Sequence, residues 1–157
     1  MTAIVCVSKS WGIGRDGALL FLISDDHKRF RSLTVGKTVI LGHKTLDTFP
    51  GGRPLKDRRN IVLSHRDLDI PGAEIAHSFD EAAALGGDDA IVIGGASVYM
   101  ALLARCDRVY VTKVDADPDA DSFFPNLDDN PDWHIDSESE VFEENGLKFQ
   151  YVDYVRN

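Results

Sequence analysis

Two adjacent aspartates follow an apolar segment in LLFLISDDHKRF, which covers residues 19–30. Ser24 precedes them, and serine is favoured at a helix N-cap because its hydroxyl can accept a bond from a free backbone N–H. Asp25 and Asp26 would then lie in the first helical turn, where the helix dipole favours negative charge. One interpretation is therefore that both carboxylates only stabilise the start of a helix.

The helical period separates the two aspartates. With 3.6 residues per turn, Asp26 shares an apolar face with Phe30. Asp25 aligns instead with Lys28 and Arg29, on the solvent side. A carboxylate on an apolar face needs a partner, because burying an unpaired charge is costly. We therefore interpret Asp25 as a solvated acid and Asp26 as a carboxylate that meets another side chain or a ligand.

Glycine occurs twice where an apolar strand meets a helix, in VILGHKT at residues 39–45 and in IVIGGASVY at residues 91–99. Glycine permits close backbone approach, and the free N–H groups of a helix start bind phosphate. Two such starts at the ends of parallel strands could hold a pyrophosphate together, with Lys44 adding charge. LSHRD at residues 63–67 ends another strand with polar and basic side chains. Each feature alone fits a tight turn or an ordinary surface, but together they indicate a nucleotide site.

The elements that would position these residues follow from the apolar pattern. We expect strands over residues 3–7, 37–42, 60–64, 73–76, 90–95 and 108–114, and helices over about 24–33, 43–49, 78–86 and 96–104. A loop would contain Gly12, Gly14 and Gly17, and Ser78 and Gly86 would cap the helix between them. The alternating tail predicts an antiparallel hairpin with a turn near residues 144–146. Apolar strands separated by helices indicate an α/β protein with a mostly parallel sheet covered on both faces.

The composition is that of an ordinary globular domain, with 157 residues and 43% hydrophobic content. The net charge of −9 argues against a general nucleic-acid binder, and no apolar run is long enough to span a membrane. The first residues do not resemble a secretory signal. Cys6 and Cys106 are too few for a disulfide framework or a zinc site, so we expect free thiols and a cytoplasmic location. Lys and Arg dominate residues 27–66, where an anionic small molecule could bind, whereas residues 115–146 carry acids and no Lys or Arg.

Seven segments, taken in order, resemble those of the dihydrofolate reductase family in its bacterial monomeric form. They are GIGRDG, DDHKRFR, VILGHKT, RPLKDRRNIVLS, VIGGASVY, VYVT and DSFFP, and the likeness extends over nearly the whole chain. The resemblance implies a single three-layer α/β domain over residues 1–157, with a central, mostly parallel eight-stranded sheet. An antiparallel C-terminal hairpin would complete this sheet, and about four helices would cover its two faces.

The resemblance also implies an activity, the NADPH-dependent reduction of 7,8-dihydrofolate to 5,6,7,8-tetrahydrofolate, with hydride delivered to C6 and a proton to N5. Asp26 matches the carboxylate that pairs with the amino-pyrimidine edge of the substrate and favours protonation of N5. Thr112 matches the hydroxyl that steadies this acid, and Leu19 matches the apolar tip of a mobile loop. Phe21 completes the catalytic group.

Other positions match the family's ligand contacts. Arg58 matches the arginine whose bidentate fork clamps the α-carboxylate of the substrate's glutamate tail. The substrate-binding group further comprises Ile4, Val5, Cys6, Asp26, His27, Phe30, Phe49, Leu55, Ile93 and Thr112. The cofactor-binding group comprises Cys6, Ile13, Gly14, Gly42, His43, Lys44, Thr45, Leu63, Ser64, His65, Arg66, Ile93, Gly94, Gly95, Ala96, Ser97, Val98 and Tyr99. The resemblance also implies a cis peptide bond between Gly94 and Gly95.

The chain departs from the family pattern beside the acidic pair, where LLFLIS replaces Leu-Pro-Trp-x-Leu-Pro. Phe21 lacks the indole N–H of the usual tryptophan, and both prolines are absent, at Leu20 and Ser24. His27 replaces an apolar ligand contact, and Ser97 stands where some members place an arginine near the 2′-phosphate. We expect these changes to affect rate, antifolate affinity and loop dynamics.

Two alternative functions remain, a pyrimidine reductase of flavin synthesis on the same fold and a non-catalytic NADPH-binding module. Asp26 with Phe30, and Arg58 after RPL, favour the folate enzyme over the first alternative. Asp26 with Thr112 argues against the second. We expect dihydrofolate and NADPH as ligands, antifolate inhibitors as competitors, a monomer, and no metal, nucleic-acid or membrane partner.

Overall fold

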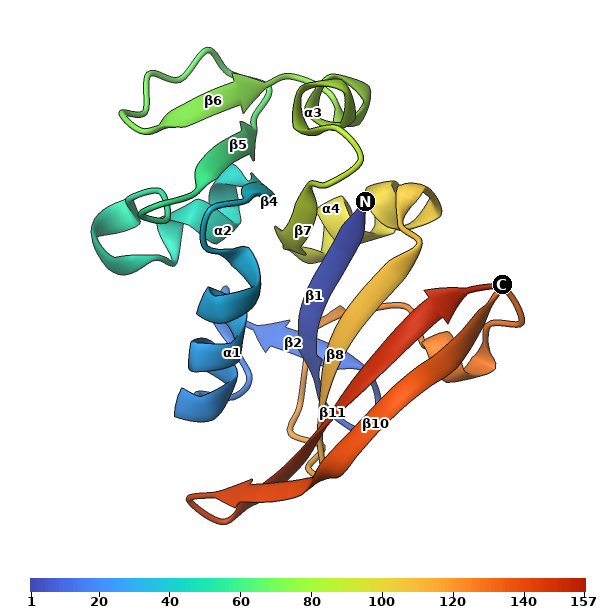
Figure 1. Ribbon diagram of the computed structural model, residues 1–157. Helices are drawn as coiled ribbons and strands as arrows, with labels where there is room; N and C mark the ends of the chain where they lie inside the picture. The colour runs from blue at the N-terminus through green and yellow to red at the C-terminus, as the bar shows by residue number, and fades with distance from the viewer.

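The computed structural model describes all 157 residues and contains two sheets, the larger of which has eight strands in the order β10-β11-β8-β1-β7-β4-β5-β6 (Figure 1). Their bounds are β1 Thr2–Val7, β4 Thr38–Gly42, β5 Arg59–Leu63, β6 Ala73–Ala76, β7 Ile91–Gly94, β8 Arg108–Val114, β10 Trp133–Glu144 and β11 Leu147–Arg156. The strands from β8 to β6 run parallel, and β11 and β10 extend the sheet as an antiparallel hairpin. The predicted mostly parallel eight-stranded sheet with its C-terminal hairpin is therefore confirmed.

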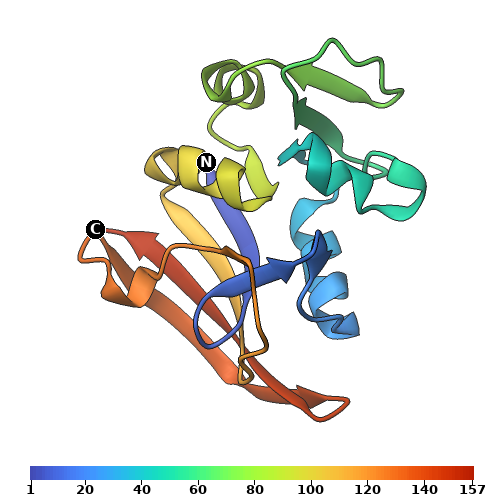
Figure 2. The same ribbon diagram turned by 180° about the vertical axis from the view of Figure 1, so that it is seen from behind.

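Helices cover both faces of this sheet. They are α1 Ser24–Thr34, α2 His43–Asp47, α3 Phe79–Gly86 and α4 Ala96–Leu102, with 3-10 turns at Pro50–Gly52, Leu103–Arg105 and Leu127–Asp129. Neighbouring strand residues point to opposite faces, so Ile40 packs in a core with α3 and α4 while Leu41 packs in another with α1 and α2. Accordingly, α4 lies behind β1 in Figure 1 and in front of it in Figure 2. None of these helices has the length and apolar composition needed to cross a membrane.

The predicted loop around Gly12, Gly14 and Gly17 is instead part of a second, three-stranded sheet. Here β2 (Gly12–Arg15) pairs with β3 (Ala18–Leu19) on one side and with β9 (Ser122–Phe123) on the other. A Cβ at Gly14 would lie 2.9 Å from the Ser122 hydroxyl, so glycine permits the close approach of β9. The prediction was wrong because the pairing strand comes from far along the chain and leaves no local signal.

Two predicted helix caps are also wrong. Ile23, not Ser24, occupies the N-cap of α1, and Ser24 is the first helical residue. Gly87, not Gly86, is the C-cap of α3, and it has a positive φ of 74°, which glycine adopts without strain. The predicted start of α3 is confirmed, since the Ser78 hydroxyl accepts a backbone N–H of the first turn.

Candidate active site

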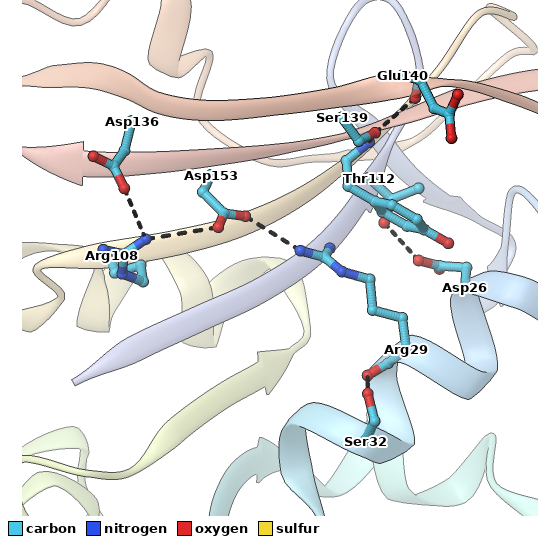
Figure 3. A network of polar contacts seen from close by, with 10 residues as sticks. Asp26, Arg29, Ser32, Arg108, Thr112, Asp136, Ser139, Glu140 and Asp153 are labelled. Atoms are coloured by element: carbon cyan, nitrogen blue, oxygen red, sulfur yellow. Dashed lines mark hydrogen bonds and ion pairs between the residues drawn. The ribbon is translucent and has the colours of Figure 1, made fainter.

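Asp26 and Thr112 meet where α1 packs on the central sheet (Figure 3). Thr112 lies on β8, in register with Cys6 of β1 on one side and Tyr151 of β11 on the other. The Thr112 hydroxyl donates to Asp26 Oδ1 at 2.5 Å. The structure therefore brings two of the predicted catalytic residues into contact, and Asp26 has one partner of the kind that its apolar position requires.

Burial raises the pKa of Asp26, because a carboxylate loses hydration when it is removed from water. The Thr112 hydrogen bond, the charges of His27 and Arg29, and the Cys6 thiol all oppose this increase. Burial, with the neighbouring Asp26 carboxylate, also raises the pKa of the Cys6 thiol, so the thiol stays protonated and can donate. The result is a carboxyl group of raised proton affinity, which suits a group that supports proton transfer near neutral pH.

A glutamate of the C-terminal hairpin caps α1 from outside the helix. The backbone N–H of Ser24 donates to Glu144 Oε2 at 2.7 Å, and the N–H of Asp25 donates to Oε1 at 3.3 Å. The Ser24 hydroxyl also donates to Oε1, at 2.7 Å. This contact explains why the N-cap prediction failed, since the serine hydroxyl serves a remote carboxylate. Asp25 has an exposed side chain, as predicted.

Arg29 does not lie on the solvent side of α1, which corrects the helical projection. Its side chain is 22% exposed, and its Nη2 lies 3.2 Å from Asp153 Oδ1 on β11. Lys28, the other basic residue of this pair, is exposed as predicted. A projection from Cα positions misjudges long side chains, because arginine can lay its stem along an apolar surface.

Five of the predicted apolar substrate contacts gather around one core cluster, whereas Val5 belongs to the other large cluster. Ile4 and Ile93 are buried members of this cluster, and Phe30, Phe49 and Leu55 pack against it while remaining partly exposed. They come from β1, β7, α1 and the segments that flank the 3-10 turn at Pro50–Gly52, so only the fold brings them together. Their partly exposed surfaces form an apolar wall beside the Asp26 helix.

The other predicted residues near Asp26 lie closer to solvent. Phe21 packs, partly buried, against a small cluster that contains Ile23 and Val114. Leu19 is 64% exposed at the end of β3, and His27 is exposed on the first turn of α1. These side chains are therefore more exposed to solvent than the buried contacts Ile4 and Ile93, and they lie at the outer edge of the site.

Arg58 is held in place by the protein before any ligand arrives. Its Nε donates to the carbonyl of Lys56 at 2.8 Å, and its Nη1 donates to the Thr34 hydroxyl at 3.0 Å. Partial burial and the nearby charge of Arg31 lower the pKa of Arg58, although an arginine stays charged. The guanidinium makes no other hydrogen bond or ion pair with the protein, so it keeps donors that a ligand could use.

We call the place where Asp26 meets Thr112 the Asp26 corner. A cavity of about 200 Å³ lies beside it and separates the small sheet from α2 and α4. Predicted residues that line it are Val5, Cys6, Ile13, Gly14, Leu19, Lys44, Thr45, Ile93, Gly94, Gly95, Ala96 and Tyr99. Residues that sequence reasoning missed are Arg15, Gly17, Ala18, Thr48 and Ser122. Most of these lie in GIGRDG and DSFFP, so the matching segments contained the signal, but their role depends on the unpredicted pairing of β2 with β3 and β9.

The two glycine junctions meet at this cavity. The Gly94–Gly95 peptide bond is cis, as the resemblance implied. A Cβ at Gly95 would lie 3.1 Å from the Thr45 hydroxyl, so the start of α4 approaches α2 closely. The Tyr99 hydroxyl donates to the carbonyl of Ile4 at 2.6 Å, which ties α4 to β1 beneath the cavity. Close packing of the two helix starts therefore favours glycine at position 95.

The segment at the end of β5, Leu63–Arg66, lies outside the cavity, and we call it the nucleotide end. Leu63 and Ser64 are buried at the end of β5, whereas His65 and Arg66 are exposed. The Ser64 hydroxyl accepts the backbone N–H of Arg66 at 3.2 Å, and the guanidinium makes no hydrogen bond or ion pair with the protein. Of the other predicted cofactor residues, Val98 is buried, Gly42 and His43 are partly buried, and Ser97 is exposed.

Comparison with known proteins gives a consistent result. The family described as "Dihydrofolate reductase" matches residues 1–156. Dihydrofolate reductase of Neisseria meningitidis serogroup B is 33% identical and covers 99% of this chain and 98% of its own length. Dihydrofolate reductase of Staphylococcus haemolyticus is 35% identical, and the match covers 98% of this chain and 90% of that protein. A solved structure of dihydrofolate reductase from Enterococcus faecalis, complexed with NADP(H) and RAB-propyl, superposes with a TM-score of 0.88 at 30% identity, covering 99% of this chain and 95% of that one.

Proposed function

Because the chain belongs to the dihydrofolate reductase family, we propose that its cleft reduces 7,8-dihydrofolate to 5,6,7,8-tetrahydrofolate with NADPH. The protein is thus an NADP-dependent oxidoreductase. One observation carries the proposal for this chain: Asp26 is hydrogen-bonded to Thr112 beside the cavity that Cys6 helps to line. A partly buried acid and a recess for the reactive half of the cofactor are therefore adjacent, as a proton transfer coupled to a hydride transfer requires.

Asp26 binds and orients the pterin in this scheme. Thr112 occupies Oδ1 and fixes the plane of the carboxyl group, so the carboxylate can pair with the amino-pyrimidine edge of the substrate. The raised proton affinity of the site favours protonation of N5, and the apolar wall at Phe30 excludes water from the ring. Positioning and exclusion of water are the contributions that the protein makes to this chemistry.

The residues around the cavity fit a dinucleotide. The space beside Gly95 would be reduced by any Cβ, and Lys44 places a cation at the cavity wall. NADPH, when bound, supplies the hydride. We propose that the cavity-lining residues named above hold its nicotinamide half. Gly42, His43, Leu63, Ser64, His65, Arg66, Ser97 and Val98 would then hold the nucleotide half.

We propose the remaining substrate roles on the same basis. Ile4, Val5, Cys6, His27, Phe49, Leu55 and Ile93 would surround the pterin and its linker, with Phe21 and Leu19 at the rim. Arg58 would clamp the glutamate α-carboxylate, supported by its hydrogen bond to the Thr34 hydroxyl. An antifolate inhibitor would compete for this cleft.

We also propose a single-domain monomer in the cytoplasm that binds no nucleic acid. All eight strands of the main sheet hydrogen-bond in one continuous order, which supports one domain over residues 1–157. Cys6 and Cys106 are both free thiols, and the net charge is −9. Sedimentation of the purified protein at several concentrations would test the monomer.

The function is tested by following NADPH absorbance in the presence and absence of dihydrofolate. We expect rapid oxidation only when dihydrofolate is present, and inhibition by an antifolate. The ribosylamino-pyrimidine substrate of flavin synthesis serves as the comparison. Turnover of that compound in preference to dihydrofolate would overturn the assignment, and binding of NADPH without any turnover would favour the non-catalytic alternative.

A further inference from the structure

Arg29 places a positive charge beside Asp26, between α1 and the sheet. It lies on the next turn of α1, and its guanidinium stacks over the Tyr151 ring at 4.2 Å and lies 5.5 Å from the Tyr110 ring centre. Its Nη2 also lies 3.2 Å from Asp153 Oδ1 (Figure 3). Three contacts from two strands therefore fix the position of a charge that a helical projection places in solvent.

Asp153 shares its carboxylate between two arginines. Its Oδ2 lies 3.7 Å from Arg108 Nη1, and Arg108 is in turn 3.5 Å from Asp136 at the edge of the sheet. The side chains of Arg29 and Asp153 are only 22% and 19% exposed, whereas Asp136 is 50% exposed. The charges closest to Asp26 are thus the least screened by water, and the outer pair is more open.

We propose that Arg29 is a positioning residue for the reaction, held by Asp153 and Tyr151 so that it anchors α1 to the sheet and supplies a fixed positive charge beside Asp26. This inference rests on the proposed function for its role in turnover. Its electrostatic part concerns only residues of this chain.

The groups that face Asp26 come from four elements. They are His27 and Arg29 on α1, Cys6 on β1, Thr112 on β8 and Tyr151 on β11. Only His27 and Arg29 can carry positive charge, and His27 is exposed to solvent, whereas arginine is a permanent cation. Arg29 is therefore the one permanent cation among them, and Asp153 is the anion that balances it.

This arrangement predicts opposite effects for two substitutions. Arg29→Met removes the favourable cation, so the pKa of Asp26 should rise by about half a unit or more. Asp153→Asn leaves the Arg29 charge unbalanced, so the pKa of Asp26 should fall. The pH at which turnover is half-maximal should follow in the same directions, because a nearby cation disfavours protonation of both Asp26 and the bound pterin.

The test is a ¹³C NMR titration of the side-chain carboxyl carbons in the ligand-free protein, with the Asp26 signal identified by its loss in Asp26→Asn. Because it needs no turnover, its outcome is independent of whether dihydrofolate is the substrate. Arg29→Lys should retain most of the wild-type titration, since it keeps the charge. Arg108→Met is the matched control, because it removes a second Asp153 partner farther along the network and should leave the Asp26 titration unchanged.

Thermal unfolding of each variant separates lost stability from altered titration. Opposite displacements of the Asp26 midpoint in Arg29→Met and Asp153→Asn support the proposal. An unchanged midpoint in both, or displacement in the same direction, would overturn it and leave Arg29 as a structural clamp only. If Arg29→Met does not fold, Arg29→Lys and Asp153→Asn still decide the matter, since a structural clamp would give no downward displacement in the latter.

Discussion

The polar groups of the Asp26 corner have hydrogen-bond partners within the protein, whereas the cations near the nucleotide end have none. At the Asp26 corner the protein supplies them: Thr112 donates to the carboxylate, and Glu144 accepts the free N–H groups at the start of the helix. At the nucleotide end Arg66 is exposed and makes no ion pair with the protein, and the same is true of Lys44 on the adjoining cavity wall. The protein already orients the polar groups of the first region in the free chain, whereas it leaves the cations of the second to a ligand.

This difference follows from the chemistry that each region performs. A group that supports proton transfer needs its pKa and orientation set in advance, so its neighbours belong to the protein. A phosphate-binding region gains affinity from unpaired cations, because an internal ion pair would compete with the ligand. Substitutions at the first region should therefore alter turnover, whereas substitutions at the second should alter cofactor affinity.

The sharpest test of this contrast is Asp26→Asn. Asparagine keeps the shape of the side chain but cannot support protonation in the same way, so we expect turnover near neutral pH to fall by about 10²–10⁴-fold. Pre-steady-state measurement of hydride transfer from NADPH checks this. Asp25→Asn is the matched control and should have little effect, because Asp25 is exposed. Equal losses in the two variants would contradict the separate roles of the two aspartates.

At the nucleotide end, Arg66→Ala should weaken NADPH binding while leaving the chemical step intact. Loss of a charged hydrogen bond to the 2′-phosphate corresponds to roughly ten- to a hundred-fold in affinity. Titration of the protein with NADPH and with NADH measures the effect, and NADH, which lacks that phosphate, provides the control. A loss of the same size for both cofactors would place Arg66 elsewhere on the nucleotide.

Gly95→Ala should also weaken NADPH binding, but by less than Arg66→Ala. Gly95 has φ −91°, so alanine is not excluded by the backbone, but its Cβ would lie 3.1 Å from the Thr45 hydroxyl. We expect weaker NADPH binding than in the wild type, with a smaller loss than in Arg66→Ala. Adding Thr45→Ser tests the cause, since it keeps the hydroxyl and should not restore affinity, whereas Thr45→Ala should reduce the loss; each double variant is compared with its Thr45 variant alone, because Thr45 itself lines the cavity. No effect of Gly95→Ala would show that the crowding is relieved elsewhere.

Local patterns predicted most of the fold, because buried parallel strands and capped helices leave signals within a few residues. The β2–β3–β9 sheet could not be predicted in this way, since Gly12 and Ser122 meet only in the folded chain. The same limit applies to the helix caps. Ser24 has the composition of an N-cap, but Glu144 of the distant hairpin decides what its hydroxyl does.

Within the site, the helical period correctly separated Asp26 from Asp25 but misplaced Arg29. Period arguments locate Cα atoms, and Asp26 is short enough for its carboxyl group to follow its Cα. The arginine side chain is long, and the rings of Tyr110 and Tyr151 determine where its charge lies. The residues whose function depends on reach or on tertiary partners are therefore the ones that sequence reasoning missed.

The smallest expected effect concerns Glu144 and bears on the completeness of the Asp26 corner without any ligand. Its bonds from the Ser24 hydroxyl and the Ser24 and Asp25 N–H groups lower the pKa of Glu144 from its usual 4.5. A lowered folded-state pKa stabilises the fold above the unfolded value, and this contribution is lost as the pH falls through the folded value. Glu144→Gln should thus lower the melting temperature modestly at neutral pH.

The difference between wild type and Glu144→Gln should begin to shrink as the pH falls below about 4.5, where the carboxylate of the unfolded chain takes up a proton, and should vanish once the pH falls through the lower pKa of the folded state. Melting temperatures measured by circular dichroism across this range check the prediction. Glu143→Gln, one residue earlier on β10, exposed and without a hydrogen-bond partner, is the control and should match the wild type at every pH. If Glu144→Gln also matched the wild type at neutral pH, the start of α1 would not depend on the hairpin, and the Asp26 corner would owe its order to Thr112 and the core alone.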